Sequence, residues 1–159
     1  DDVTLDLPIP SMSKGSSMAL GVAVAQPDRR VVLWDGDGSV LMNLGSLVTV
    51  AGRAPANFYH IVLDNGMYAM TGGQPLPNAG CFSWTGLAQA AGYAETYEFD
   101  DLEEWTTRIG EVLGKTGPVL IVMKTTPELT DWRNAPPEPQ RKMSEAAPVA
   151  RSALAGDTP

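Results

Sequence analysis

The chain has little of what several classes of protein need. Its single cysteine, Cys81, allows neither an internal disulfide framework nor a Cys-ligated cluster built by this chain alone, so a reducing compartment is expected. Eleven basic residues face nineteen acidic ones, and the net charge of −8 argues against nucleic acid or an anionic membrane as a partner. No run reaches the roughly 18 apolar residues of a membrane span, and no signal peptide is visible. A cytoplasmic location is therefore expected.

What the chain does have is a regular alternation of apolar runs and helical segments. Hydrophobic residues make up 43% of the 159 residues, enough for the core of one domain. Continuous apolar runs predict buried strands at Arg30–Trp34, Phe58–Leu63 and Pro118–Lys124, and a short edge strand at 93–99. Helices are predicted within 11–25, 43–51, 85–91 and 100–114. The pattern predicts an α/β fold, a parallel sheet flanked by helices on both faces.

Two stretches differ from this pattern. The α/β domain is predicted to span residues 1–128, and the Pro- and Ala-rich residues 129–159 are expected to be weakly ordered unless a partner holds them. The chain begins with Asp1 rather than Met, so part of an N-terminal sequence is expected to be missing.

The residues with chemical potential follow two of the predicted strands. Asp37 stands between Gly36 and Gly38 directly after the first strand. Glycines have no Cβ, so this backbone is expected to approach a phosphate closely and to adopt positive φ. The N–H groups of Gly38 and Ser39 would then lie near the start of the next helix, a favourable place for an anion.

A second oxygen-bearing side chain follows the next strand. Asn65 comes 28 residues after Asp37, separated from it by one helix and one strand. A right-handed crossover of this length would place the two side chains side by side at the carboxyl edge of the sheet. A carboxylate and a carboxamide oxygen suit Mg²⁺, which commonly bridges protein oxygens to phosphate oxygens. Gly-Asp-Gly or Asn-Gly alone would be an ordinary turn, whereas the spaced pair indicates a metal site.

These motifs resemble those of a known family. The segments DGDGSVLMNLGSLVTV and HIVLDNGMYAMTGGQP are similar to the thiamine-diphosphate motif of 2-oxo acid decarboxylases, in particular the sulfopyruvate and phosphonopyruvate decarboxylases and the separate β subunit of the former. The resemblance covers residues 10–128 and implies the diphosphate-binding domain of the thiamine-diphosphate-binding fold. It also implies thiamine diphosphate and Mg²⁺ as cofactors and a 2-oxo acid as substrate.

The resemblance assigns roles around the diphosphate. Asp37 and Asn65 would bind Mg²⁺ through their side chains, and Met67 through its backbone carbonyl, although many relatives have glycine at the Met67 position. Gly38 and Ser39, with the preceding Gly36, would hold the diphosphate.

The resemblance also assigns roles at the other end of the cofactor. Pro10-Ser11-Met12 is similar to the family's Gly-Ser-Met, so Met12 would support the bent cofactor and the Pro10 carbonyl would accept a hydrogen bond from its 4′-amino group. Proline lacks an N–H but keeps its carbonyl, so this role survives. Ser11 lies between them in the cofactor site, and Ser13 stands where the family has another glycine.

Further residues have both a functional and a structural interpretation. Gln74 and the glycines of 71–74 could face a sulfonate, phosphonate or carboxylate of the substrate, or could form an ordinary glycine-rich connection. Tyr68 could line the cofactor pocket or pack in the core. His60, the only histidine, is expected in the core or an interface. Cys81 lacks an evident basic partner and is not expected to be a nucleophile.

The chain is expected to need a partner. A second, pyrimidine-binding chain, the α subunit, would supply the glutamate that activates the cofactor, in an α2β2 assembly with sites between the subunits. A missing N-terminal domain could supply it instead. Two other functions stay open: the β subunit of a 2-oxo acid:ferredoxin oxidoreductase, whose Fe–S clusters would have to lie on other chains, and a non-catalytic cofactor-binding module.

Overall fold

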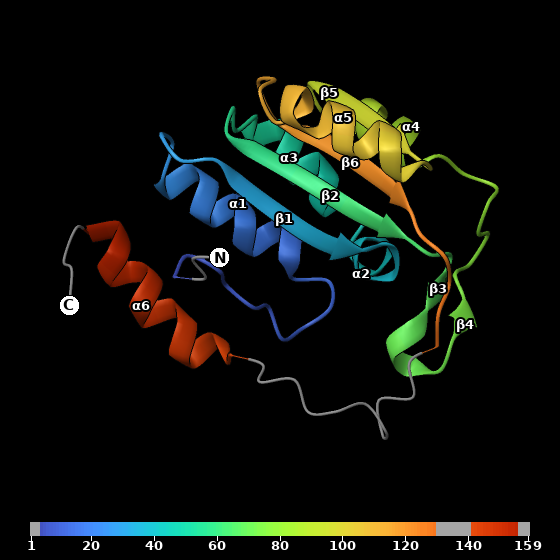
Figure 1. Ribbon diagram of the computed structural model, residues 1–159, viewed down its shortest axis with the longest axis horizontal. Coiled ribbons are helices and arrows are strands. Elements are labelled where there is room, and N and C mark those ends of the chain that lie inside the picture. The colour runs from blue at the N-terminus through green and yellow to red at the C-terminus, as the bar shows by residue number, and fades with distance from the viewer. Residues whose placement is uncertain (1–3, 130–140, 156–159) are drawn as a thin grey trace. The chain divides into compact units, whose positions relative to one another are not determined.

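A parallel sheet of four strands organises the chain (Figure 1). The strand order is β1-β2-β6-β5, and each neighbouring pair runs parallel. The strands are β1 (Val31–Gly36), β2 (Phe58–Asp64), β6 (Val119–Lys124) and β5 (Glu95–Phe99). All four strands were predicted, including the edge position of β5. This computed structural model describes residues 4–129 and 141–155, and divides into a unit of residues 12–130 and a unit of residues 1–11 with 131–159.

Helices connect the strands of the larger unit. They are α1 (Gly15–Ala25), α2 (Asp37–Met42), α3 (Ser46–Arg53), α4 (Trp84–Ala91) and α5 (Leu102–Val112). Side chains cap two of them: Ser83 Oγ accepts from the Gly86 N–H at the start of α4, and Asp101 Oδ1 accepts from the Glu104 N–H at the start of α5. The helix predicted at 43–51 corresponds to α3, whereas the short helix α2, which begins as soon as β1 ends, was not predicted.

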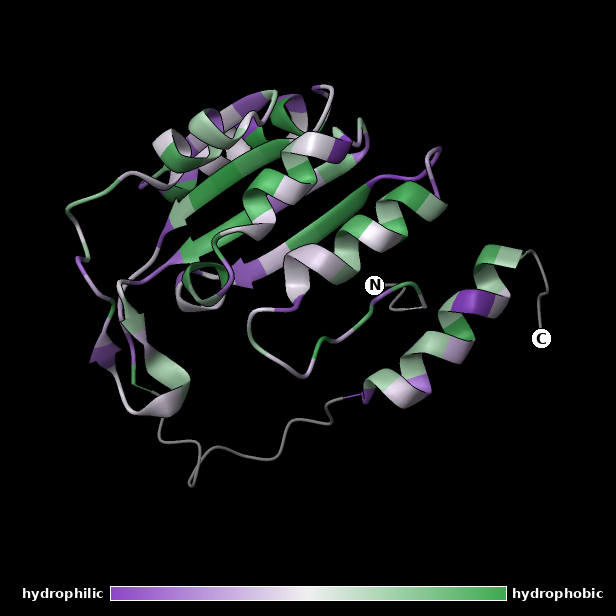
Figure 2. Ribbon diagram, turned by 180° about the vertical axis from the view of Figure 1, so that it is seen from behind, coloured by the Kyte–Doolittle hydropathy of each residue, from purple (hydrophilic) through white to green (hydrophobic). Residues whose placement is uncertain are grey.

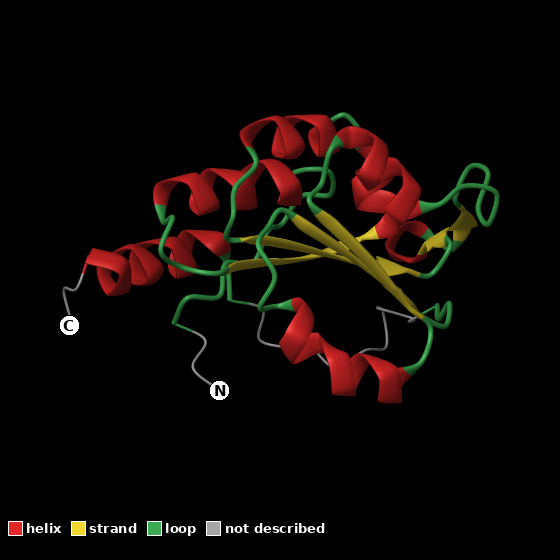
Figure 3. Cartoon of the chain, turned by 90° about the horizontal axis from the view of Figure 1, so that it is seen from above, coloured by secondary structure: helices red, strands yellow, loops and turns green. Residues whose placement is uncertain are grey.

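Helices lie on both sides of the sheet, as predicted (Figure 3). On one face Tyr59 and Ile61 of β2 join Val119 and Ile121 of β6 in an apolar cluster, against which the side chains of α5 pack. The other face carries Leu33, Phe58 and Val62, all buried, and is covered by α1, α3 and α4. Burial on both faces explains the continuous apolar runs of β2 and β6, which are among the green strands of Figure 2. The prediction of a buried strand is wrong for β1, an edge strand in which Val32 is 38% and Trp34 56% exposed.

The register of β1 and β2 brings their carboxyl ends together. Asp35 pairs with Val62, and Gly36 with Leu63, so the residues that follow both strands emerge at one edge of the sheet. The segment beyond β2, with the glycines of 71–74, is a small hairpin. It consists of β3 (Met67–Tyr68), a 3₁₀ turn (Ala69–Thr71) and β4 (Gln74–Pro75), with β3 and β4 antiparallel.

The smaller unit contains one helix that was not predicted. Helix α6 spans Met143–Ala155 and includes Pro148, whose ring removes one N–H from the helix interior. Ala146 and Ala150, four residues apart on one side of the helix, are buried. The expectation of weak order is therefore wrong for residues 143–155, while residues 130–140 lie outside the described part of the chain. Nowhere in the described ranges is a helix both long and apolar enough to cross a membrane.

Two glycines of the larger unit should respond in opposite ways to a methyl group. A Cβ on Gly117 would lie 2.7 Å from the Phe58 carbonyl oxygen and 2.9 Å from that of Pro55, whereas a Cβ on Gly21 of α1 would meet nothing within 4 Å. We expect Gly117→Ala to lower the free energy of unfolding by about 1–3 kcal/mol. Gly21→Ala should raise it by up to about 1 kcal/mol through helix propensity. Urea denaturation measures both, and equal stability of the two variants would contradict the packing around Gly117.

Candidate functional site

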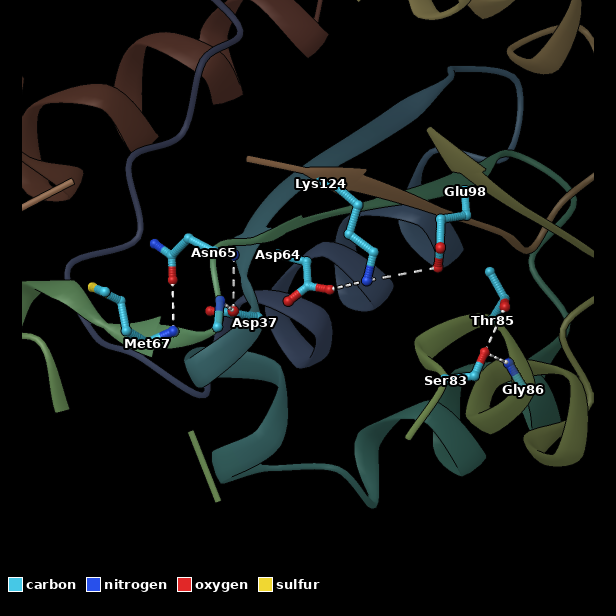
Figure 4. Close-up of polar contacts among 10 residues, drawn as sticks. Asp37, Asp64, Asn65, Met67, Ser83, Thr85, Gly86, Glu98 and Lys124 are labelled. Atoms are coloured by element: carbon cyan, nitrogen blue, oxygen red, sulfur yellow. Dashed lines mark hydrogen bonds and ion pairs between the residues drawn. The ribbon is translucent and has the colours of Figure 1, made fainter. Parts of the chain in front are cut away.

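Asp37 lies at the centre of the site formed by the two strand ends. It begins α2, is only 2% exposed, and turns its carboxylate toward the end of β2 (Figure 4). Oδ2 accepts hydrogen bonds from the N–H groups of Asn65 at 3.0 Å and Gly66 at 2.7 Å, and Oδ1 accepts from the Gly38 N–H at 2.6 Å. The predicted juxtaposition of Asp37 with the Asn65 segment is thus present, and backbone amides make the contact.

The electrostatics of Asp37 favour a cation. Burial raises the pKa of its carboxyl and the neighbouring Asp64 raises it further, while the N–H groups of Gly66 and Gly38 act in the opposite direction. None of the ion pairs found among the described residues involves Asp37. A buried carboxylate without a cationic side chain within ion-pair distance would be stabilised by a metal ion.

A second group of charges borders Asp37, and the sequence analysis missed it. Lys124 at the end of β6 bonds Asp64 at the end of β2, with 2.5 Å between Nζ and Oδ2, and its Nζ lies 3.9 Å from Glu98 of β5. Burial lowers the pKa of Lys124, but the hydrogen bond and charge of Asp64 outweigh this effect, so the pKa is raised. The ends of parallel neighbouring strands bring these residues together. They could not be found from the sequence because the order of the strands in the sheet was not predicted.

Asn65 and Met67 follow β2 as a tight turn. The Asn65 carboxamide oxygen accepts a hydrogen bond from the Met67 N–H at 2.9 Å, which fixes the side chain beside Asp37. The residue with positive φ in this turn is Gly66, at 74°, and Met67 is not among the residues with positive φ. The replacement of the family's glycine by Met67 therefore causes no backbone strain.

The two glycines around Asp37 differ from the expectation in their backbone conformation. Neither Gly36 nor Gly38 has positive φ, so that expectation is wrong; Gly36 is extended, with φ −84° and ψ 148°. A Cβ on Gly38 would lie 2.6 Å from two ring carbons of Tyr68, whereas a Cβ on Gly36 would meet nothing within 4 Å. Gly38 is thus needed because Tyr68 of the hairpin packs directly on the start of α2.

The segment before α1 is tied to α2. The Ser13 N–H donates to Ser39 Oγ at 2.9 Å, and Asn43 Nδ2 donates to the Ser13 carbonyl at 3.0 Å. Ser13 has φ of 69°, a left-handed conformation that glycine adopts more easily, which accounts for the glycine of the family at this position. Asn43 was not singled out from the sequence. Ser39 is buried and Met12 is 37% exposed, next to this tied segment.

Three other predicted site residues stand apart from these contacts. Pro10 and Ser11 belong to the smaller unit. Gln74 is exposed in the hairpin, where its Nε2 donates to the Thr71 carbonyl at 3.0 Å and its Oε1 accepts from Thr71 Oγ1 at 3.0 Å. The side chain of Gln74 thus closes its own turn, and contact with a substrate anion stays a prediction for this residue.

The donor set suits a hard cation bound jointly with phosphate. Within the described ranges, no group of three or more His, Cys, Asp and Glu side chains could hold a metal by itself. The Asp37 carboxylate, the Asn65 carboxamide and nearby backbone carbonyls are oxygen donors of the type that Mg²⁺ prefers, and Mg²⁺ usually completes its shell with phosphate and water. The residues present therefore fit Mg²⁺ with a diphosphate better than a metal alone.

Comparison with known proteins places the chain in a family. Residues 9–123 match the thiamine pyrophosphate enzyme, C-terminal TPP binding domain. The chain therefore belongs to the thiamine pyrophosphate enzymes, as the resemblance implied.

Several individual proteins of this kind are similar to the chain. The chain is 41% identical over 117 residues to phosphonopyruvate decarboxylase of Streptomyces hygroscopicus, covering 74% of this chain and 29% of that protein. It is 40% identical over 121 residues to the sulfopyruvate decarboxylase subunit beta of Methanothermobacter thermautotrophicus, covering 76% and 62%. The solved thiamine diphosphate-dependent 4-hydroxybenzoylformate decarboxylase of Rhodococcus jostii RHA1 superposes with a TM-score of 0.62 at 25% identity, covering 75% and 24%. The chain thus spans less than two thirds of each relative.

The contact between Gly38 and Tyr68 can be tested by a double-mutant cycle. Gly38→Ala should destabilise the protein by about 1–3 kcal/mol, because the methyl group displaces the Tyr68 ring. In the Tyr68→Ala background the same change should cost less, which gives a coupling energy of about 0.5–3 kcal/mol.

Gly36→Ala is the matched control for this cycle. Its Cβ meets open space, so its effect on unfolding by urea should stay within about 0.5 kcal/mol. Strict additivity of Gly38→Ala and Tyr68→Ala would refute the contact.

Proposed function

We propose that this chain holds the diphosphate and Mg²⁺ of thiamine diphosphate in an enzyme that decarboxylates a 2-oxo acid. The observation that carries the proposal is the Asp37 carboxylate, buried at the end of β1 and bonded to the N–H groups of Asn65 and Gly66 at the end of β2. Membership of the family supports the cofactor, and the names of the similar decarboxylases support the reaction.

The residues of this chain would bind and orient the charged end of the cofactor. Asp37 and Asn65 would hold Mg²⁺ through their side-chain oxygens and Met67 through its carbonyl, while Gly36, Gly38 and Ser39 would line the diphosphate. Gly38 would have to release its N–H from Asp37 Oδ1 before that N–H could donate to a phosphate oxygen. Metal binding by the carboxylate favours this exchange, because the cation replaces the amide as its partner.

The segment before α1 would serve the other end of the cofactor. Met12 would support the bent cofactor, and the Pro10 carbonyl would accept a hydrogen bond from the 4′-amino group, with Ser11 between them. The hydrogen bonds that join Ser13 to Ser39 and Asn43 support this assignment for Met12, the residue before Ser13, since they connect it to the diphosphate side of the site. When bound, thiamine diphosphate supplies an electron sink for the loss of carbon dioxide from a 2-oxo acid.

The names of the relatives support a substrate class and a partner. We assign a 2-oxo acid with a second anionic group, similar to sulfopyruvate or phosphonopyruvate, because similar proteins carry these names. Gln74 and Tyr68 of the hairpin are the candidates on this chain for contact with that group. The beta subunits among the relatives support a pyrimidine-binding α subunit, which would supply the activating glutamate in an α2β2 complex.

The metal site predicts a specific loss of cofactor binding. Asp37→Asn should weaken Mg²⁺-dependent binding of thiamine diphosphate by more than about 100-fold, because residues that only orient a metal ligand already contribute 10–100-fold. Isothermal titration calorimetry of the assembled protein measures the affinity. Asp100→Asn, a substitution of the same type at an exposed turn, is the control and should bind normally. Retention of tight, metal-dependent binding by a folded Asp37→Asn variant would remove the basis of the proposal.

The reaction predicts equal amounts of two products. The complex with its partner should release carbon dioxide and an aldehyde in a 1:1 ratio, about one of each per acid consumed, from a 2-oxo acid bearing a sulfonate or phosphonate. Enzyme-coupled assays of both products across a series of 2-oxo acids measure this. Carbon dioxide released only with an added electron acceptor, without aldehyde, would indicate the ferredoxin oxidoreductase alternative. Cofactor binding without turnover of any acid would indicate the non-catalytic module.

A further inference from the structure

Three polar side chains are buried together on the face of the sheet that α1, α3 and α4 cover, and the proposed cofactor site uses none of them. His60 of β2 is 0% exposed, Tyr93 after α4 is 6% exposed, and Asp35 of β1 is 8% exposed. His60 Nδ1 lies 3.3 Å from the Tyr93 hydroxyl oxygen, and His60 Nε2 lies 3.6 Å from Asp35 Oδ2. Among the buried side-chain atoms of the described residues, Nε2 is the one without a hydrogen-bond partner.

The surroundings of His60 decide which ring nitrogen carries the proton. If Nδ1 carried it, the lone pair of Nε2 would face the Asp35 carboxylate, which is electrostatically unfavourable. With the proton on Nε2, this N–H has the carboxylate oxygen 3.6 Å from its nitrogen, and Nδ1 accepts from the Tyr93 hydroxyl. Burial raises the pKa of Tyr93, so its hydroxyl keeps the proton that it donates. The donors therefore run in one direction, from Tyr93 through His60 toward Asp35.

Asp35 is held between this imidazole and the first turn of α1. A Cβ on Gly15, the first residue of α1, would lie 2.9 Å from Asp35 Oδ2 and 3.1 Å from a Leu33 methyl carbon. The helix therefore begins in direct contact with the carboxylate, whose negative charge suits a helix N-terminus. A movement of a few tenths of an ångström by Asp35 toward His60 Nε2 would bring the two atoms within hydrogen-bond distance. It would also change the contact between the Asp35 carboxylate and Gly15.

The start of α1 is also where the segment of Met12 and Ser13 ends. Ser13 is tied to Ser39 and Asn43 of the proposed cofactor site. We infer that Tyr93, His60 and Asp35 form a buried polar chain, hydrogen-bonded between Tyr93 and His60 and electrostatic between His60 and Asp35, that positions the start of α1, and through it the Met12–Ser13 segment, for cofactor binding. Tyr93 and His60 are positioning residues in this inference, whose connection to the cofactor rests on the proposed function.

The direction of the chain has a direct spectroscopic test, because His60 is the only histidine of the protein. In the full chain labelled with ¹⁵N, long-range ¹H–¹⁵N spectra should show a ring that carries its proton on Nε2, with Nδ1 as the acceptor. Tyr93→Phe removes the donor to Nδ1, so the share of the Nδ1-protonated ring should rise. A ring protonated on Nδ1 in the unmodified protein would overturn the inference.

Tyr59→Phe is a matched control on the same strand as His60. Tyr59 is 5% exposed, and its hydroxyl donates to the Lys115 carbonyl at 2.6 Å. This substitution also removes one buried hydroxyl, but on the opposite face of β2. It should leave the His60 ring signals unchanged, and it should not move the backbone amide signals of Ser13 and Gly15. Tyr93→Phe should shift both amide signals, an effect that a mere loss of stability does not produce in the native spectrum.

Calorimetric titration of the assembled protein with thiamine diphosphate and Mg²⁺ links the chain to the cofactor. Tyr93→Phe should weaken binding by about tenfold, the lower end of the range for residues that orient a ligand, and Tyr59→Phe should not. Unchanged affinity and unchanged Ser13 and Gly15 signals in Tyr93→Phe would overturn the inference even if the cofactor binds. Absence of binding by the unmodified protein would instead count against the proposed function, and the amide shifts would still decide whether the chain positions α1.

Discussion

The hydrogen bonds between the Asp37 carboxylate and the amides of Asn65 and Gly66 are the constraint on which the site depends. They join the end of β1 to the end of β2, and they exist because these strands are parallel neighbours in register. A buried carboxylate without such donors would carry a large desolvation cost. The residue that would bind the metal is therefore also the residue that connects two strand ends, so the geometry of the site and the pairing of the sheet are not independent.

The carboxyl edge of the sheet is acidic, as is the chain as a whole. Asp37 and Asp64 lie together, and Lys124 is bonded to Asp64 and lies near Glu98, so its charge is already shared. The edge therefore offers a diphosphate backbone amides rather than a cluster of free cationic side chains. In the proposed function, a diphosphate approaching two carboxylates would need a divalent cation between them, and the oxygen donors of Asp37 and Asn65 suit Mg²⁺.

The sequence was sufficient for the strands, for their parallel arrangement and for the pairing of Asp37 with the Asn65 segment, because buried runs and polar strand ends are local features. It was insufficient where conformation depends on contacts between distant segments. The expectation of positive φ at Gly36 and Gly38 was wrong. Gly38 is glycine because the ring of Tyr68, thirty residues away in the chain, leaves no room for a Cβ. Ser13 adopts the left-handed conformation instead, and only the glycine of the family at this position gave any sign of it. The group formed by Asp64, Lys124 and Glu98 needed the order of β2, β6 and β5, which no periodicity contains.

The two faces of the sheet differ in the polarity of the side chains buried on them. The face under α5 is filled by apolar side chains such as Tyr59, Ile61 and Ile121. The face under α1 carries Asp35 and His60 within its core, and Ser16 of α1 bonds Ser46 of α3 at 2.7 Å between buried hydroxyl oxygens. An apolar core tolerates small adjustments among similar packings, whereas directed hydrogen bonds fix one arrangement. In the inference above, the polar groups lie where α1 would have to start at a defined position beside the proposed cofactor site, whereas no such segment starts on the apolar face under α5.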